Sequence, residues 1–173
     1  MVDSGGGAVR RSSQEHEFRC RLVWTGGARG TTTSYASYSR DYRIDIPGKA
    51  SIEGSAARAF RGDDGRANPE DLLVASLSAC HCLSYLALAA RAGIEVISYE
   101  DDAWGKLMPI NGKLRFSEVV LRPSVTISAS SSLEKALSLH AAAHGECFIA
   151  NSVNFPVRNE PTVVFAAAAL RAD

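Results

Sequence analysis

The feature that most constrains this fold is a long helix, predicted to begin within NPEDLLVASLSACHC (residues 68–82) and to run to about Ala92. Pro69 is favoured in the first turn of a helix, and Glu70 suits the positive end of the helix dipole. Gly93 is a typical residue at a helix end. Small and apolar residues dominate the helix, so we expect it to be buried, yet its middle carries two cysteines and a histidine.

The segments on both sides of this helix predict β-strands. Alternating side chains predict strands over residues 17–26 and 34–46, and two further strand-like runs flank Asn111-Gly112, a pair that favours a tight hairpin. A second helix is predicted over residues 130–145, ending at Gly145, and a last strand over 161–170. This order of elements predicts an α+β fold in which antiparallel sheet predominates.

Length and composition predict one folded domain. The chain has 173 residues, of which 46% are hydrophobic, which is enough for a sizeable core. Residues 1–16 are rich in Gly and Ser, so we expect a flexible tail there and a single domain over residues 17–173. We find no internal repeat and no linker composition within that domain.

Charge and hydropathy exclude several classes of partner. The 19 basic and 19 acidic side chains balance, which argues against a nucleic-acid-binding protein. Residues 71–90 come closest to a membrane span but are interrupted by Ser, His and Cys, so we expect no membrane partner. No apolar signal segment follows the tail, which indicates a reducing, cytoplasmic location.

The four cysteines are Cys20, Cys80, Cys82 and Cys147. Residues on a helix turn by about 100° each, so Cys80 and Cys82 lie on nearly opposite faces and cannot form a disulfide with each other. A partner for Cys80 must therefore come from elsewhere, and Cys147, just past the second helix, is a candidate. The alternative is that these thiols are small residues of the core.

A zinc site is a further alternative. His140, His144 and Cys147 form an H-x3-H-x2-C pattern that places two imidazoles on one helical face. The run Cys80-His81-Cys82 instead spreads its side chains around the helix axis, so few of them can reach one ion. We therefore predict no metal and no other cofactor.

Two stretches, NPEDLLVASLSAC and the distant HGECFIANSV, resemble the OsmC/Ohr family of osmotically inducible and organic hydroperoxide resistance proteins. The resemblance covers roughly residues 17–170, and YSRDYRIDIPG and FRGDDGRANPEDLL are most similar to the OsmC-like subgroup. It implies an intertwined homodimer of α+β subunits with the long helices at its centre. The implied activity is thiol-dependent reduction of organic hydroperoxides without metal or flavin.

The resemblance also implies roles for the two distant cysteines. Cys80 would be the peroxidatic thiol, which becomes a sulfenic acid, and Cys147 the resolving thiol, which condenses with it to a disulfide. An external dithiol, either a small thiol or a lipoylated protein, would then restore both thiols.

Glu70 and an arginine would orient and activate the Cys80 thiol, since a nearby guanidinium stabilises a thiolate. We favour Arg40 over Arg29 for that arginine and place Arg61 third. Glu70 and Cys80 are ten residues apart, about 15 Å along a continuous helix. Because a glutamate cannot span that distance, we expect the site to lie at the dimer interface.

Three other functions stay open from the residues themselves. The chain could be a non-catalytic binder of small molecules or acyl groups, or a structural zinc protein. A cysteine hydrolase would need a histidine base beside Cys80, for which His140 or His144 could serve.

Overall fold

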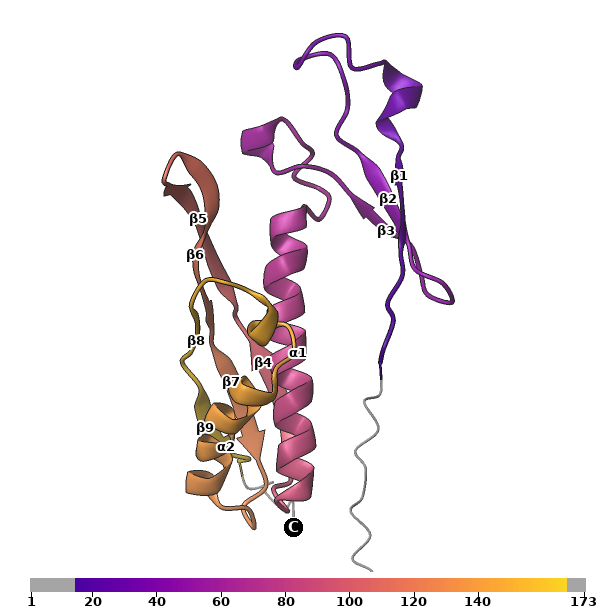
Figure 1. Cartoon of the computed structure of the whole chain (residues 1–173). Helices are drawn as coiled ribbons and strands as arrows, with labels where there is room; N and C mark the ends of the chain where they lie inside the picture. The colour runs from indigo at the N-terminus through magenta and orange to yellow at the C-terminus, as the bar shows by residue number, and fades with distance from the viewer. Residues whose placement is uncertain (1–14, 168–173) are drawn as a thin grey trace, which may run out of the picture. The chain divides into compact units, whose positions relative to one another are not determined.

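The computed structural model describes residues 15–167 of the chain, and it divides into two compact units, one up to Arg66 and one from Ala67 onward. Figure 1 labels the elements of both. The tail predicted over residues 1–16 lies, except for its last two residues, outside the described residues. The prediction of a single domain over residues 17–173 stays a prediction.

The first unit is a small antiparallel sheet with the strand order β1-β2-β3. Its elements are β1 (Arg21–Trp24), the 3-10 helix η1 (Gly26–Arg29), β2 (Tyr42–Asp45), β3 (Ile52–Gly54) and the 3-10 helix η2 (Arg58–Phe60).

The predicted strand over residues 34–46 is wrong in its first half. Residues 32–38 form bends and turns, and only residues 42–45 pair as a strand. The Ser37 backbone amide donates to the carbonyl of Ser34, and the Ser37 hydroxyl bonds to the same carbonyl. Serine side chains that bond to nearby backbone groups compete with strand pairing, which explains the turn.

Helix α1 (Pro69–Arg91) begins and ends as the sequence predicts. Asn68 and Asp71 form a reciprocal capping box, in which each side chain accepts a hydrogen bond from the other's backbone amide, at 2.8 and 3.1 Å. Gly93, just beyond the end, adopts a left-handed φ of 71°, a conformation that costs glycine little.

Four strands of the second unit form a long antiparallel hairpin in two segments. Its strands are β4 (Val96–Asp101), β5 (Trp104–Ile110), β6 (Lys113–Leu121) and β7 (Pro123–Ile127), with β5 pairing to β6 and β4 to β7. Asn111 and Gly112 make its turn, with φ of 52° and 75°, and confirm the hairpin prediction. Two short strands, β8 (Val157–Asn159) and β9 (Thr162–Phe165), add parallel pairs to β6 and β7.

The sequence pattern did not reveal β8, because three residues are too few for a visible alternation. It did predict β9, although the expected strand extended to residue 170, and residues 168–170 lie outside the described part. Four of the six strand pairs are antiparallel, as the α+β prediction required.

Helix α2 (Leu133–Glu146) is capped by Ser132, whose side chain accepts a hydrogen bond from the Lys135 amide at 3.2 Å. The predicted end at Gly145 is one residue early. Gly145 keeps helical geometry, and the Cys147 amide closes the last turn by donating to the His144 carbonyl at 3.3 Å. The 3-10 helix η3 (Ala150–Ser152) follows.

The strands of the second unit and helix α2 pack against one face of α1. In Figure 1, strands β4–β9 and helix α2 lie along one side of this helix. Residues four apart on it are buried there: Leu77, His81, Tyr85 and Ala89. Leu77 packs with Val119 and Leu121, whereas Tyr85 and Ala89 pack with residues of α2, β7 and β9.

The opposite face of α1 is apolar but exposed. Ala75, Ala79, Leu83 and Ala87 lie at four-residue spacing along it, and Leu83 is 68% exposed. By length and composition alone α1 could span a membrane, but the core helix of a soluble protein meets the same criteria. The second unit leaves this face exposed.

Candidate functional site

The structure brings together two of the predicted site residues, Cys80 and Cys147. Cys80 lies near the middle of α1, and Cys147 is the residue at which α2 ends. Cys80 lies close enough to Cys147 to raise the pKa of its thiol, and both are free thiols. The Ala150 amide also donates to the Cys147 sulfur at 3.4 Å, so the chain that turns into η3 helps to fix this sulfur in place.

The two thiols differ in their access to solvent. Cys147 is 1% exposed, whereas Cys80 is only half-buried. Burial, and after it the neighbouring Cys80 side chain, raise the pKa of the Cys147 thiol to about 11, against a smaller lowering by the Ala150 and Ile149 amides. Cys147 therefore stays a thiol at neutral pH, and Cys80 is the thiol that a reagent from solution can reach.

A groove of about 420 Å³ is lined by residues that follow Cys80 on α1 and that flank Cys147 in the chain, although neither thiol itself lines it. Ser84, one turn after Cys80, lines it together with Leu83 and Phe148, which directly follows Cys147. Phe148 is 80% exposed, so the groove presents unpartnered apolar surface. Arg91 and Glu146 add charged groups to its lining.

Glu70 and Cys80 are not brought together within the chain. Both lie on the uninterrupted helix α1, so the axial separation of about 15 Å expected from the sequence holds. Glu70 instead lines a cavity of about 440 Å³ with Trp104 and Phe116. Its Oε2 atom is buried and finds no hydrogen-bond partner among residues 15–167, which leaves that oxygen able to accept a donor from outside the described chain.

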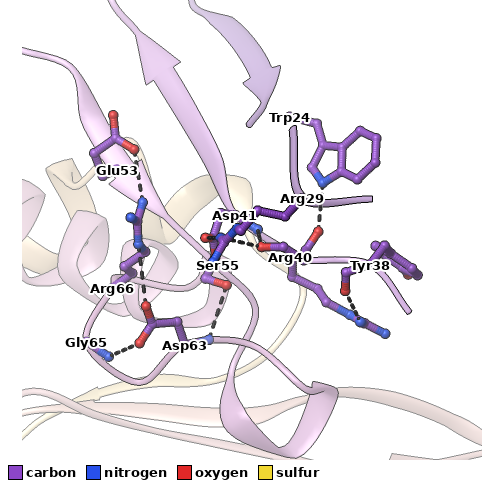
Figure 2. A network of polar contacts seen from close by, with 11 residues as sticks. Trp24, Arg29, Tyr38, Arg40, Asp41, Glu53, Ser55, Asp63, Gly65 and Arg66 are labelled. Carbon is purple, nitrogen blue, oxygen red and sulfur yellow. Dashed lines mark hydrogen bonds and ion pairs between the residues drawn. The ribbon is translucent and has the colours of Figure 1, made fainter. Parts of the chain in front are cut away.

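Arg29, Arg40 and Arg61 line one pocket of about 360 Å³ in the first unit, in which Arg29 and Arg40 have different bonding partners (Figure 2). Arg29 pairs with the buried Asp41 carboxylate and bonds to the Ser39 hydroxyl at 2.8 Å. Arg40 donates to the backbone carbonyls of Tyr35 and Tyr38.

The Arg40 guanidinium also lies over the rings of these two tyrosines, 3.9 Å from the centroid of Tyr38 and 4.8 Å from that of Tyr35. Arg61, the third candidate, is exposed and has a left-handed φ of 66°. The placement of these arginines relative to Cys80 stays a prediction.

The other helical thiol, Cys82, faces away from Cys80, as the helical spacing predicts. Burial raises its pKa, and Asp101 on β4 raises it too. That carboxylate is held by the Ser78 hydroxyl at 2.6 Å and by the Arg122 amide at 2.7 Å. Cys82 is thus a protonated, structural neighbour of β4. Cys20 is exposed and lies just before β1.

A contact that the sequence analysis missed joins His81 to His140. The Nε2 atom of His81 lies 3.1 Å from Nδ1 of His140, and both rings are buried. A signal was present in the sequence: each histidine sits four residues after a residue that faces the core, Leu77 in α1 and Ala136 in α2. Their distance in sequence hid the pairing.

The histidines do not gather into a metal site. Among residues 15–167, no group of three or more His, Cys, Asp or Glu side chains is arranged to hold a metal ion. The zinc alternative built on His140, His144 and Cys147 therefore gains no support from this geometry, because Cys147 turns toward Cys80 and His140 toward His81.

Comparisons with known proteins agree on one family. A family profile described as OsmC-like protein matches residues 62–161. An OsmC-like protein of unknown function from Vibrio cholerae is 34% identical, with a TM-score of 0.79 over 86% of this chain and 100% of that chain. No protein of curated function matches the sequence significantly.

Two organic hydroperoxide resistance proteins share the fold at lower identity. The protein from Elizabethkingia anophelis is 21% identical, with a TM-score of 0.64 over 89% of this chain and 99% of its own. The protein from Bacillus subtilis is 22% identical, with a TM-score of 0.59 over 84% of this chain and 98% of its own. At these identities the likeness establishes the fold, not the activity.

Proposed function

This chain belongs to the OsmC-like protein family, and from that premise we propose that it reduces organic hydroperoxides to alcohols through Cys80 and Cys147. The observation that carries the proposal is the contact between an accessible thiol on α1 and a buried, protonated thiol at the end of α2. The attacking thiol must be accessible to substrate, and the resolving thiol must lie close to the attacking thiol. The two surroundings fit those two roles.

The proposed reaction uses only these thiols and an external dithiol. The Cys80 thiolate attacks the distal oxygen of ROOH, the O–O bond breaks, and a proton accompanies the leaving alcohol ROH. The Cys147 sulfur then attacks the Cys80 sulfenic acid, forming the disulfide and releasing water. A dithiol in a reducing cytoplasm reduces that disulfide by exchange and is itself oxidised. No metal or other cofactor takes part.

The apolar groove beside the thiols supports an organic peroxide over hydrogen peroxide as substrate. Phe148 can bury an alkyl or aryl group, a gain that hydrogen peroxide cannot provide. Leu77 lies three residues before Cys80 on α1, but it is fully buried in the core and does not line the groove.

Arg40 is the arginine that we propose for activating the thiol, with Glu70 orienting it. The Arg40 guanidinium has no acidic partner among the described residues, so its charge is not neutralised, whereas the charge of Arg29 is neutralised by Asp41. The buried Oε2 of Glu70 lacks a donor, and a guanidinium would satisfy it.

We also propose a homodimer, formed along the exposed face of α1. Ala75, Ala79, Leu83 and Ala87 make a stripe of small and apolar side chains on which a second copy of the helix could pack closely. A dimer would also let a residue of the partner reach Glu70 or Cys80, which α1 alone keeps about 15 Å apart.

The proposal is tested by measuring the loss of cumene hydroperoxide and of hydrogen peroxide, separately, with dihydrolipoamide as reductant. We expect fast turnover of the organic peroxide, and loss of turnover to the background rate in Cys80→Ser. In Cys147→Ser, mass spectrometry should show Cys80 oxidised beyond the sulfenic acid, because no thiol remains to resolve it.

Cys82→Ser is the matched control, since it removes a thiol from the opposite face of the same helix, and it should keep wild-type turnover. Equally slow turnover in wild type and Cys80→Ser would contradict the peroxidase. The apolar groove would then favour the non-catalytic alternative, a binder of small apolar molecules.

A further inference from the structure

The contact between His81 and His140 joins the two helices that carry the candidate thiols. His81 belongs to α1 and His140 to α2, 59 positions further along the chain. Their side chains are 0% and 2% exposed, and the facing nitrogen atoms are 3.1 Å apart. A hydrogen bond between two imidazoles needs one ring to donate and the other to accept, so the accepting ring must be neutral.

Aromatic packing holds both rings in place. The two imidazole planes are 14° from parallel with centroids 5.4 Å apart, so the rings lie end to end along their hydrogen bond, and the Tyr85 ring stacks on His140 with centroids 4.1 Å apart. The Tyr85 hydroxyl donates to the Ala136 carbonyl of α2 at 3.2 Å. The same helix interface thus contains one contact between histidines and, one turn further along α1, a hydrogen bond from the Tyr85 hydroxyl, which can be removed while the ring that stacks on His140 is kept.

The histidine contact lies next to the thiol pair on both helices. His81 directly follows Cys80, and His140 precedes Cys147 by seven residues, which is two helical turns and returns to nearly the same face. The distance between the two sulfur atoms therefore depends on how α1 and α2 are aligned at the histidine contact. The backbone turn into η3 also holds Cys147, because the Ala150 amide donates to its sulfur.

We propose that His81 and His140 form a clamp between the helices that holds Cys80 and Cys147 within bonding distance of each other. Both are positioning residues, because they act through the thiols and touch no substrate. This inference deepens the proposed function, on which it rests, and nothing in the resemblance to hydroperoxide resistance proteins implied it.

The surroundings of the clamp favour its neutral form. Burial lowers the pKa of His81 and lowers that of His140 to about 4. Among the charged and titratable groups that face the pair, Asp101 on β4 raises the pKa of His81, and His144 on α2 lowers it. The outer nitrogens, Nδ1 of His81 and Nε2 of His140, have no partner among residues 15–167, so an added proton would lack an acceptor.

Because the pKa values of both histidines are lowered in the closed clamp, acid should weaken the clamp. In the open or unfolded chain His140 would take up a proton near its ordinary pKa of 6.5, whereas in the closed clamp it does so only near 4. The stabilisation is therefore complete above about pH 6.5, declines as the pH falls through that window, and is lost below about pH 4.

The test is the thiol–disulfide equilibrium of the reduced protein with glutathione, in which the dithiol and GSSG give the Cys80–Cys147 disulfide and two GSH. His140→Phe should lower that equilibrium constant about tenfold, because the His81 nitrogen loses its partner while the ring volume remains. His140→Asn places an amide oxygen near the position of Nδ1, and it should restore the constant to within about twofold of wild type.

Tyr85→Phe is the matched control, since it removes the other hydrogen bond between the same helices, and it should leave the equilibrium unchanged. Measured between pH 7 and pH 4 and approached from both directions, the wild-type constant should fall with acid, whereas that of His140→Asn should not show this step. This second comparison needs no phenylalanine variant and so survives if His140→Phe does not fold.

Equal constants for wild type and His140→Phe, or an equal fall in Tyr85→Phe, would overturn the clamp alone, leaving the peroxidase intact. The clamp is likewise overturned if His140→Asn keeps the acid step. If wild type forms no disulfide between Cys80 and Cys147, the proposed resolving step fails and the clamp fails with it.

Discussion

Arg29 and Arg40 show how much the surroundings of a single side chain decide. Eleven residues separate them in the chain, and both lie in the first unit. Arg29 offsets the charge of Asp41, a carboxylate only 5% exposed, so removing the arginine would leave a buried charge unpaired. Arg40 is held by carbonyls and aromatic rings, which fix the guanidinium but leave its charge free to act on an anion.

Replacement of Arg40 should therefore affect chemistry more than replacement of Arg29. We expect Arg40→Met to slow the oxidation of Cys80 by cumene hydroperoxide at least about tenfold, since interactions with charged groups are worth more than neutral ones. Arg40→Lys keeps the charge and should retain part of the rate. Single-turnover peroxide consumption by the reduced protein measures this step directly.

The matched control is Arg29→Met combined with Asp41→Asn, which removes the other arginine without leaving a buried charge. It should oxidise at nearly the wild-type rate. A slower reaction in this double variant than in Arg40→Met would transfer the activating role to Arg29.

At the scale of elements, α1 illustrates a helix whose ends are set by local chemistry. The Asn68 side chain accepts from the Asp71 amide, and the Asp71 side chain accepts from the Asn68 amide. Pro69 needs no amide hydrogen bond in this first turn. These interactions span four residues, so the start of the helix could be predicted without any knowledge of the fold. The position of Glu70 at the rim of its cavity depends on that start.

Asn68→Ala should lower the free energy of unfolding by about 1 kcal/mol, because it leaves the Asp71 amide without its acceptor. Asn68→Asp keeps an acceptor at the same position and should cost much less. Urea unfolding followed by circular dichroism measures both variants. Equal losses in the two would show that the cap is not what stabilises this end of α1.

At the scale of the whole molecule, the exposed stripe on α1 is apolar surface that the rest of the chain does not cover. Leu83 at the centre of this stripe is 68% exposed. Exposed apolar surface on this scale is typical of an interface. The dimer proposal explains why the sequence keeps alanine and leucine here, where a solvent-facing stripe would be polar.

Leu83→Glu should weaken the dimer by at least about tenfold, because it places a charge in an apolar contact. Sedimentation equilibrium across a range of protein concentrations measures the dissociation constant. Leu137→Glu is the control, since this leucine of α2 is also exposed, at 43%, but lies outside the stripe. A monomeric wild-type protein, or equal weakening by both changes, would contradict this interface.

The sequence by itself determined the features that arise from neighbours in the chain. Helix α1, the Asn111-Gly112 hairpin and the opposite directions of Cys80 and Cys82 follow from caps, turn residues and the 100° helical repeat, which act over a few residues. The same local logic failed at residues 34–39, because the serine side chains there bond to the backbone and displace the strand that alternation indicated.

Tertiary structure alone decided which distant groups meet. The sequence could offer Cys147 only as a candidate partner for Cys80, and it gave no reason to pair His81 with His140 across 59 residues. Those contacts depend on how α2 docks on α1, which is set by packing of Tyr85, Ala136 and the sheet behind them. Packing depends on all the contacting residues together, so no pattern within one segment encodes it.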